Sequence, residues 1–292
     1  MTRRLHVGLV QLAMAPDKAT NVARACAEIG AAASRGATLI CLPELFAGPY
    51  FCQTEDVANF DLAEPIPGPT FDAVAAAARA AGVTVVASLF ERRAAGVYHN
   101  TSVTLGPDGA LLGTYRKMHV PDDPLFLEKF YFTPGDLGFV AHATPTAVVG
   151  SLVCWDQWYP EAARLTSLRG AEVLCYPTAI GWQPYEKAEW GAAQLDAWRT
   201  VQRGHAIANG VFVAAVNRVG HEGPAGAGID FWGHSFVADP FGVVLAEAGE
   251  GEETLVVELD LDRIEQVRRW WPFLRDRRVD AYEGLTRRLL DS

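Results

Sequence analysis

Short apolar runs alternate with alanine-rich segments along the N-terminal part of this chain. Aliphatic and β-branched residues fill Leu5–Leu12, Thr38–Leu42 and Val83–Leu89, as is typical of buried strands. Between these runs, Asn21–Arg35 and Pro69–Ala81 have helical spacing, and a glycine follows each of them as a natural stop. Strands that alternate with helices predict an α/β fold in which helices cover the faces of a sheet.

Hairpins and further helices continue this pattern. The turn Gly106-Pro-Asp-Gly109 separates strand-like runs at Tyr98–Leu105 and Ala110–Arg116, which indicates a hairpin. Helices are predicted at Pro160–Leu168 and Lys187–Asn209. Further strands are predicted at Ala171–Tyr176, Val211–Val216, Phe231–Ala238, Val243–Glu247 and Leu255–Leu259. No linker of Ser, Gly and Pro interrupts the chain, so we predict one domain over residues 1–292, with a C-terminal tail at 262–292.

Composition excludes several classes of function. A net charge of −10 argues against binding to a phosphate backbone, so no nucleic-acid partner is expected. The five cysteines are scattered without C-x-x-C spacing, which is typical of reduced thiols. There is no signal peptide and no apolar run of membrane length, so we predict a soluble, cytoplasmic protein without a membrane partner. Dispersed histidines and the lack of a P-loop predict no metal and no cofactor.

Three strand-like runs end on reactive or charged side chains. The run from Thr38 ends on the carboxylate of Glu44, the run from Leu111 ends on the amine of Lys117, and a third ends on the thiol of Cys154. Each residue alone has an ordinary interpretation, since a cysteine in an apolar strand is usually a core residue and the two charges would usually be solvated. Together, a thiol, a base and a cation are the parts of a covalent hydrolase, provided that they converge.

The residues around Cys154 favour the catalytic interpretation. The segment Trp155–Pro160 is predicted to open a helix, so the backbone amide of Trp155 would point at an oxyanion and the helix N-terminus would lower the thiol pKa. Cys41 and Cys175 lie inside their strands and fit a structural role better. Charge and aromatic rings mix between Lys117 and Gly135, which indicates a pocket wall or a subunit contact.

Three segments resemble the motifs of the nitrilase superfamily of carbon–nitrogen hydrolases, in the same order. They are Leu42-Pro-Glu44, Tyr115-Arg-Lys117 and the Cys154-Trp-Asp of V-G-S-L-V-C-W-D. The resemblance implies a four-layer α-β-β-α sandwich and a triad of Glu44, Lys117 and Cys154, with Glu128 as an accessory carboxylate. It also implies a homodimer or a higher homo-oligomer, with the tail at Trp270–Arg278 crossing the dimer contact.

Within the superfamily the resemblance is greatest to the N-carbamoylputrescine amidohydrolases. It rests on Phe46-Ala-Gly-Pro-Tyr-Phe-Cys52, Lys117–Pro124, Glu128–Asp136 and Cys154–Glu161. It implies cofactor-independent hydrolysis of a small ureido substrate to an amine, carbon dioxide and ammonia through a carbamoyl-thiol intermediate. Two alternatives stay open: a hydrolase of N-carbamoyl amino acids, 3-ureidopropionate or another small amide, and a non-catalytic scaffold on the same fold.

A cationic substrate tail requires a carboxylate and aromatic walls. Glu186 and Glu189 are the candidate carboxylates, although both would equally fit as solvated residues at the start of the long helix. The candidate aromatic residues are Tyr50, Trp155 and Trp182. A substrate that ends in a carboxylate would instead require arginine. Arg199 and Arg203 are the candidates for that role, although a helix surface suits them better.

Overall fold

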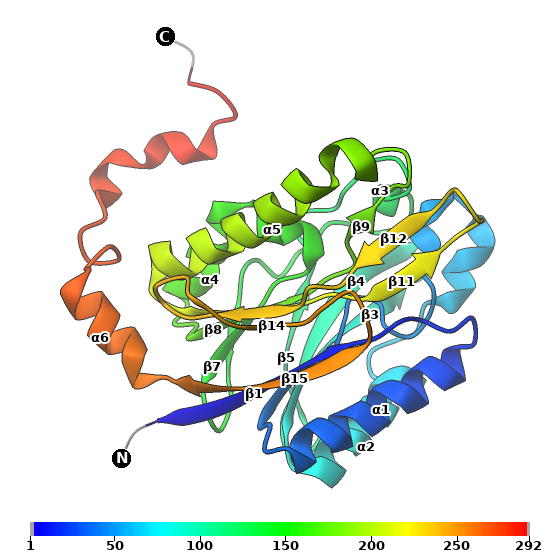
Figure 1. Ribbon diagram of the computed structural model, residues 1–292, viewed down its shortest axis with the longest axis horizontal. Helices are drawn as coiled ribbons and strands as arrows, with labels where there is room; N and C mark the ends of the chain where they lie inside the picture. Colours follow the sequence, from blue (N-terminus) through cyan, green and yellow to red (C-terminus); the bar gives the residue numbers. More distant parts are fainter. Residues whose placement is uncertain (1–2, 291–292) are drawn as a thin grey trace.

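Two six-stranded sheets stack face to face in the computed structural model, which describes residues 3–290 (Figure 1). The strand order of the first sheet is β15-β1-β2-β3-β4-β5, and that of the second is β14-β13-β10-β8-β7-β6. The first sheet contains β1 (Arg4–Gln11), β2 (Leu39–Cys41), β3 (Thr84–Ala94), β4 (Val97–Leu105), β5 (Leu111–Arg116) and β15 (Glu253–Asp260). The second contains β6 (Ala141–Ala143), β7 (Val148–Ser151), β8 (Val173–Pro177), β10 (Phe212–Val216), β13 (Phe236–Ala238) and β14 (Val244–Glu247).

Helices cover the outer face of each sheet. Helices α1 (Lys18–Ser34) and α2 (Pro69–Ala81) pack over the first sheet, and α4 (Pro160–Leu168) and α5 (Lys187–Asn209) pack over the second (Figure 1). Between the sheets, the inward-facing side chains of both form one apolar layer that excludes water. The predicted four-layer α-β-β-α sandwich is therefore confirmed.

Parallel strands occupy the middle of each sheet and run toward the same end. Strand β2 pairs in parallel with β1 and β3, and β8 pairs in parallel with β7 and β10. The carboxyl ends of parallel strands are where α/β folds place their ligand sites, because the loops that follow the strands are free of the ladder. Glu44 follows β2 and Cys154 follows β7 at such ends.

The predicted helices at Pro69–Ala81, Pro160–Leu168 and Lys187–Asn209 match the structure at both ends. The single strand predicted at Phe231–Ala238 is wrong. Gly233 and His234 both have positive φ, at 66° and 55°, and they divide it into β12 (Ile229–Trp232) and β13. Strand β12 joins a three-stranded sheet with β11 (Val219–Glu222) and β9 (Gly181–Trp182), which sequence patterns did not predict.

The C-terminal tail begins with α6 (Asp262–Trp270) and then extends away from the sandwich (Figure 1). Ile264 and Val267 of α6 are buried, whereas Trp270 is 83% exposed and Leu285 is 65% exposed. Short helices complete the chain: α3 (Glu128–Tyr131), η1 (Phe51–Gln53), η2 (Val57–Leu62), η3 (Cys154–Trp158), η4 (Val279–Ala281) and η5 (Glu283–Thr286). Within residues 3–290, no helix has both the length and the apolar character to cross a membrane.

Candidate active site

The side chains of Glu44, Lys117 and Glu128 meet between the ends of the two sheets and are fully buried. Lys117 Nζ lies 2.8 Å from Glu44 Oε1 and 2.6 Å from Glu128 Oε2. The thiol of Cys154 is close enough for all three charges to act on its pKa. The three strand ends therefore converge on one site.

The two carboxylate oxygens of Glu44 have different surroundings. Oε1 accepts hydrogen bonds from Lys117 Nζ and from Asn100 Nδ2, the latter at 2.7 Å. Oε2 is buried and has no hydrogen-bond partner in the described part of the chain. A buried carboxylate oxygen without a donor is costly in a folded protein. It is therefore a ready acceptor for a proton from a neighbouring group.

Strand β7 ends at Ser151, and the 3-10 helix η3 begins at Cys154, after the two intervening residues Leu152 and Val153. The φ of Cys154 is 41°, a conformation that is strained for any residue with a Cβ and that occurs often at functional sites. Sequence reasoning expected a helix N-terminus to lower the thiol pKa, and this expectation is wrong. Burial and the negative charge of Glu44 raise the pKa of Cys154 well above its ordinary value, against the opposing effect of Lys117. The resting group is therefore a thiol and not a thiolate.

Asp156 fixes the turn that carries Cys154. Its Oδ2 accepts hydrogen bonds from the Val153 amide at 3.0 Å and from the Tyr115 hydroxyl at 2.7 Å. Its Oδ1 lies 3.0 Å from the amide nitrogen of His119 and 2.7 Å from that residue's Nδ1. The fully buried carboxylate thus ties the thiol to the segment after Lys117. The sequence alone gave no role to Asp156 beyond its place beside the thiol.

Charges determine the protonation states around Lys117. Burial alone would lower the pKa of Lys117, but Glu128 and Glu44 outweigh it and raise that pKa well above its ordinary value. Lys117 is therefore a fixed cation and not a base. Burial, together with the charge of Glu44, raises the pKa of Glu128 to about 7 against the opposing effect of Lys117. The hydroxyl of Tyr50 donates a hydrogen bond of 2.6 Å to Glu128 Oε1, which favours the carboxylate form.

A cavity of about 460 Å³ opens onto Cys154. Aromatic rings form much of its wall, and two carboxylates, Asp123 and Glu186, line it, while none of its lining residues is a lysine or arginine. The side chain of Gln183 joins the loops that carry these two carboxylates, since its Nε2 donates to the carbonyl of Pro124 at 2.6 Å. The aromatic lining residues are Phe126, Trp155, Trp158, Tyr185 and Trp232.

Only part of the set proposed for substrate binding lines this cavity. Trp155 and Glu186 do, whereas Tyr50, Trp182 and Glu189 do not. Trp182 is buried against Trp232, and its Nε1 donates to the carbonyl of Gly191 at 3.0 Å. Tyr50 contacts Glu128, and Glu189 is exposed in the first turn of α5. Sequence reasoning missed Asp123, although the segment that contains it was expected to form a pocket wall.

The two arginines considered for an acidic substrate also lie elsewhere. Arg199 bonds to His234 and Glu247, and Arg203 Nε donates to the carbonyl of Gly242 at 2.7 Å. Neither lines the cavity. Within residues 3–290, no group of three or more His, Cys, Asp or Glu residues has an arrangement that would hold a metal ion.

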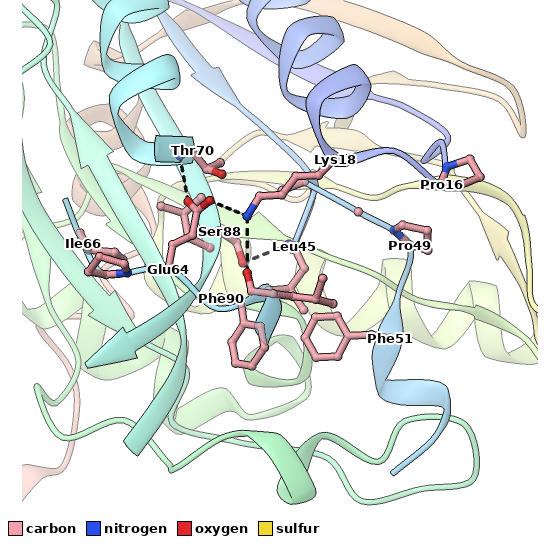
Figure 2. Close-up of a pocket in the computed structure, with 15 residues that line it drawn as sticks. Pro16, Lys18, Leu45, Pro49, Phe51, Glu64, Ile66, Thr70, Ser88 and Phe90 are labelled. Carbon is pink, nitrogen blue, oxygen red and sulfur yellow. Dashed lines mark hydrogen bonds and ion pairs between the residues drawn. The ribbon is translucent and has the colours of Figure 1, made fainter. Parts of the chain in front are cut away.

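A second, smaller cavity of about 100 Å³ lies behind the turn that follows Glu44. Leu45 and Ser88 are among its lining residues, together with the rings of Phe51 and Phe90. Figure 2 shows Lys18 and Glu64 paired at its edge, where Glu64 also accepts a hydrogen bond from the amide of Thr70. The turn is therefore only partly packed on this side.

Comparison with known proteins agrees with the geometry. The sequence profile of the carbon-nitrogen hydrolase family matches residues 6–269. The chain belongs to this family. It is 44% identical over 289 residues to an N-carbamoylputrescine amidase of Solanum lycopersicum, a match that covers 97% of this chain and 95% of that protein. It is 38% identical to a citrullinase of Francisella tularensis, over 97% of this chain and 99% of the relative.

A solved structure gives the same answer for the fold. The crystal structure of a carbon-nitrogen hydrolase from Helicobacter pylori superimposes with a TM-score of 0.95 at 47% sequence identity. The match covers 98% of this chain and 100% of that one. This carbon-nitrogen hydrolase is accordingly an amidohydrolase, and its two-sheet architecture is that of the nitrilase superfamily.

Proposed function

We propose that this hydrolase cleaves the ureido group of N-carbamoylputrescine, with Cys154 as the nucleophile and Glu44 as the base. The observation that carries the mechanism is the unpartnered Glu44 Oε2 in the same buried cluster as a protonated thiol. In the first half-reaction Glu44 takes the thiol proton, and the sulfur attacks the carbonyl of R-NH-CO-NH2. Lys117 Nζ and the Trp155 amide stabilise the oxyanion. The proton on Glu44 passes to the leaving nitrogen, and ammonia departs.

Water completes the reaction. The first step leaves R-NH-CO-S-Cys154, and Glu44, again a carboxylate, takes a proton from water as the oxygen attacks the carbonyl. The carbon–sulfur bond breaks, the thiol regains its proton, and the carbamate decomposes to amine and carbon dioxide. Glu128 holds Lys117 throughout, because it accepts a bond from that ammonium on one oxygen and from Tyr50 on the other.

The walls of the cavity favour a substrate with a cationic tail. Asp123 and Glu186 supply two negative charges, and no basic residue among the described lining residues balances them. Aromatic faces beside a carboxylate are a common way to hold an ammonium group. A tail that ends in a carboxylate, as in 3-ureidopropionate, would meet repulsion here. Arg199 and Arg203, the candidates that would have reversed this preference, do not line the cavity.

Kinetics on a panel of ureido compounds tests the substrate. We expect kcat/KM for N-carbamoylputrescine to exceed that for 3-ureidopropionate by roughly 100-fold, which corresponds to about 2.7 kcal/mol. Citrulline, which carries a carboxylate beside its ammonium group, should have a kcat/KM between those of the other two compounds. A preference for the acid would overturn this choice of substrate.

Two substitutions in the cavity wall test how the substrate tail is held. Glu186→Gln and Asp123→Asn should each raise the KM for N-carbamoylputrescine roughly 10-fold, since each loses one charge-assisted contact. Asp196→Asn, an exposed change on α5, is the matched control.

We also propose that the sandwich is one domain and that its tail packs against a second copy. Trp270, 83% exposed, and Trp271, 55% exposed, would be unusual on a free surface. We expect the protein to sediment as a dimer or larger, and the double variant Trp270→Ser/Trp271→Ser to shift toward a monomer. Trp190→Ser removes a ring of α5 that is 55% exposed, as Trp271 is, and should leave the assembly intact. A monomeric wild-type protein would contradict the proposal.

A further inference from the structure

A buried arginine holds the turn that presents Glu44. Arg218 is fully buried, and its Nη2 donates to the carbonyls of Glu44 at 2.6 Å and Leu45 at 3.0 Å. Its Nη1 reaches the carbonyl of Gly48 at 3.2 Å. Leu45 has a φ of 49°, the left-handed conformation that a leucine adopts only under restraint. The guanidinium is therefore bonded to both ends of a strained turn.

The opposite face of this turn has fewer polar contacts, among them a bond of 3.3 Å from the Leu45 amide to the hydroxyl of Ser88. Leu45, Gly48 and Pro49 line the cavity of about 100 Å³ described above (Figure 2). Side chains that face a void lose the packing contacts that would otherwise fix their position. The bonds from Arg218 to the carbonyls therefore restrain the backbone of Glu44 together with the bond of 3.3 Å from its own amide to the carbonyl of Thr178.

The partner of Arg218 extends the same restraint to the other carboxylate. Glu222 accepts a bond of 2.8 Å from Arg218 Nη1 through one oxygen and a bond from the Tyr50 amide through the other. Tyr50 in turn donates its hydroxyl to Glu128. The guanidinium also lies 5.9 Å from the centre of the Tyr50 ring. The Arg218–Glu222 ion pair thus contacts Glu44 directly, through the Glu44 carbonyl, and contacts Glu128 indirectly, through Tyr50.

We propose that Arg218 and Glu222 form a positioning pair, which sets Glu44 to take the thiol proton and Tyr50 to hold Glu128. Neither residue of the pair lines the cavity that opens onto Cys154. Buried ion pairs seldom stabilise a protein more than apolar side chains of the same volume would. The function of this pair is geometric, because the planar fork of arginine bonds to three carbonyls and a carboxylate at once. This inference rests on the roles proposed above for Glu44 and Cys154.

Alkylation of Cys154 by iodoacetamide tests the pair without a substrate. The site of labelling is mapped by mass spectrometry, and the rate is followed at pH 7. Glu222→Gln should slow alkylation roughly 10-fold and Arg218→Met roughly 100-fold, as expected when a base moves by about 1 Å. Arg218→Lys should recover only part of the loss, since it keeps the charge but not the fork.

The pH dependence of the same rate gives a readout that loss of stability alone would not move. The charged and titratable groups that face Glu128 are Lys117, Glu44 and Tyr50, together with the buried thiols of Cys52 and Cys154. With its pKa near 7, Glu128 should give wild type an inflection there, with the rate rising as Glu128 ionises and anchors Lys117. Glu222→Gln loosens Tyr50 and so weakens the hydrogen bond from its hydroxyl to the Glu128 carboxylate. The pKa of Glu128 should therefore rise, and the inflection should move to higher pH. Glu128→Gln should remove it.

A matched variant and a folding check complete the test. Arg263→Met breaks a different arginine–carboxylate pair, in which Arg263 Nε lies 2.9 Å from Asp239 Oδ2. This pair is far along the chain from the Glu44 turn, so the variant should leave the alkylation rate and its pH inflection unchanged. A folded Glu222→Gln variant with the wild-type rate and inflection would overturn the proposal. If Arg218→Met fails to fold, the alkylation rates of Glu222→Gln and Arg218→Lys test the positioning pair instead. If wild type hydrolyses no ureido compound, the proposed substrate fails, while alkylation still judges the pair.

Discussion

Cys154→Ala should reduce hydrolysis of the ureido substrate by at least about 10⁴-fold while the protein stays folded. The variant removes the only atom that this scheme allows to form the covalent intermediate, and the remaining groups cannot replace a nucleophile. Lys117 and the cavity walls stay in place, so substrate binding should change little. Ammonia release from the purified variant measures the first effect, and equilibrium binding of the substrate measures the second.

Cys175→Ala is the matched control for this result. Cys175 is also a fully buried thiol, and it lies on β8, beside the strand that precedes Cys154. Loss of a small core side chain should lower stability modestly and leave kcat/KM within about twofold of wild type. Turnover by Cys154→Ala close to the wild-type rate would eliminate the covalent mechanism. Equal losses in both variants would point to damage to the fold instead.

The sequence predicted helices better than it predicted the interruptions of strands. Helix periodicity and terminal residues are local signals, and both ends of the helix at Pro69–Ala81 follow from its proline and Gly82. The break between β12 and β13 is not local. There Gly233 and His234 turn the chain from the small sheet into the second large sheet, and the apolar run on either side conceals the change.

The same distinction explains the candidate site. Glu44, Lys117 and Cys154 could be proposed together because each follows a strand-like run, and strand ends meet in a stacked sandwich. Asn100 was missed because it lies inside β4, where a polar residue looks like part of an alternating strand. Arg218 had a usable signal, since it follows the buried run Val211–Val216, but a lone arginine is normally solvated.

The walls of the cavity beside Cys154 were the least predictable part. Trp182 and Trp232 are neighbours, with ring centres 5.3 Å apart, yet only Trp232 lines the cavity. Which of two adjacent rings faces a cavity depends on the pairing of β9 with β12, and no local pattern encodes that register. Asp123 lies in a turn of a long irregular segment, where sequence gives no direction for a side chain.

Lys117→Met should lower kcat strongly and also destabilise the protein. The variant loses the fixed cation of the proposed oxyanion site, an effect worth roughly 10²–10³ in kcat for one donor. It also leaves the carboxylates of Glu44 and Glu128 buried without their cation. Breaking a buried pair from one side costs about 3–5 kcal/mol. Lys129→Met, on the same segment but solvent-exposed, is the control and should change stability by less than about 0.5 kcal/mol.

The pH dependence of this instability identifies its cause. In wild type the pKa of Glu128 is already about 7, above the value of about 4.3 for an unfolded glutamate. Removing Lys117 raises it further, because Lys117 opposed the rise. A folded pKa above the unfolded one means that stability is greatest below about pH 4.3 with respect to this group and is lost as pH rises through the folded value. Denaturant titrations of Lys117→Met should therefore show much lower stability at pH 8 than at pH 5.

A second substitution separates charge balance from catalysis. Lys117→Met/Glu128→Gln removes one of the two carboxylates that lack a cation, so it should regain part of the stability lost at pH 8. It should regain none of the activity, because the oxyanion still lacks its cation. Recovery of activity in the double variant would mean that Lys117 serves only to neutralise buried charge. Stability that does not depend on pH would mean that the carboxylates find other partners once the amine is gone.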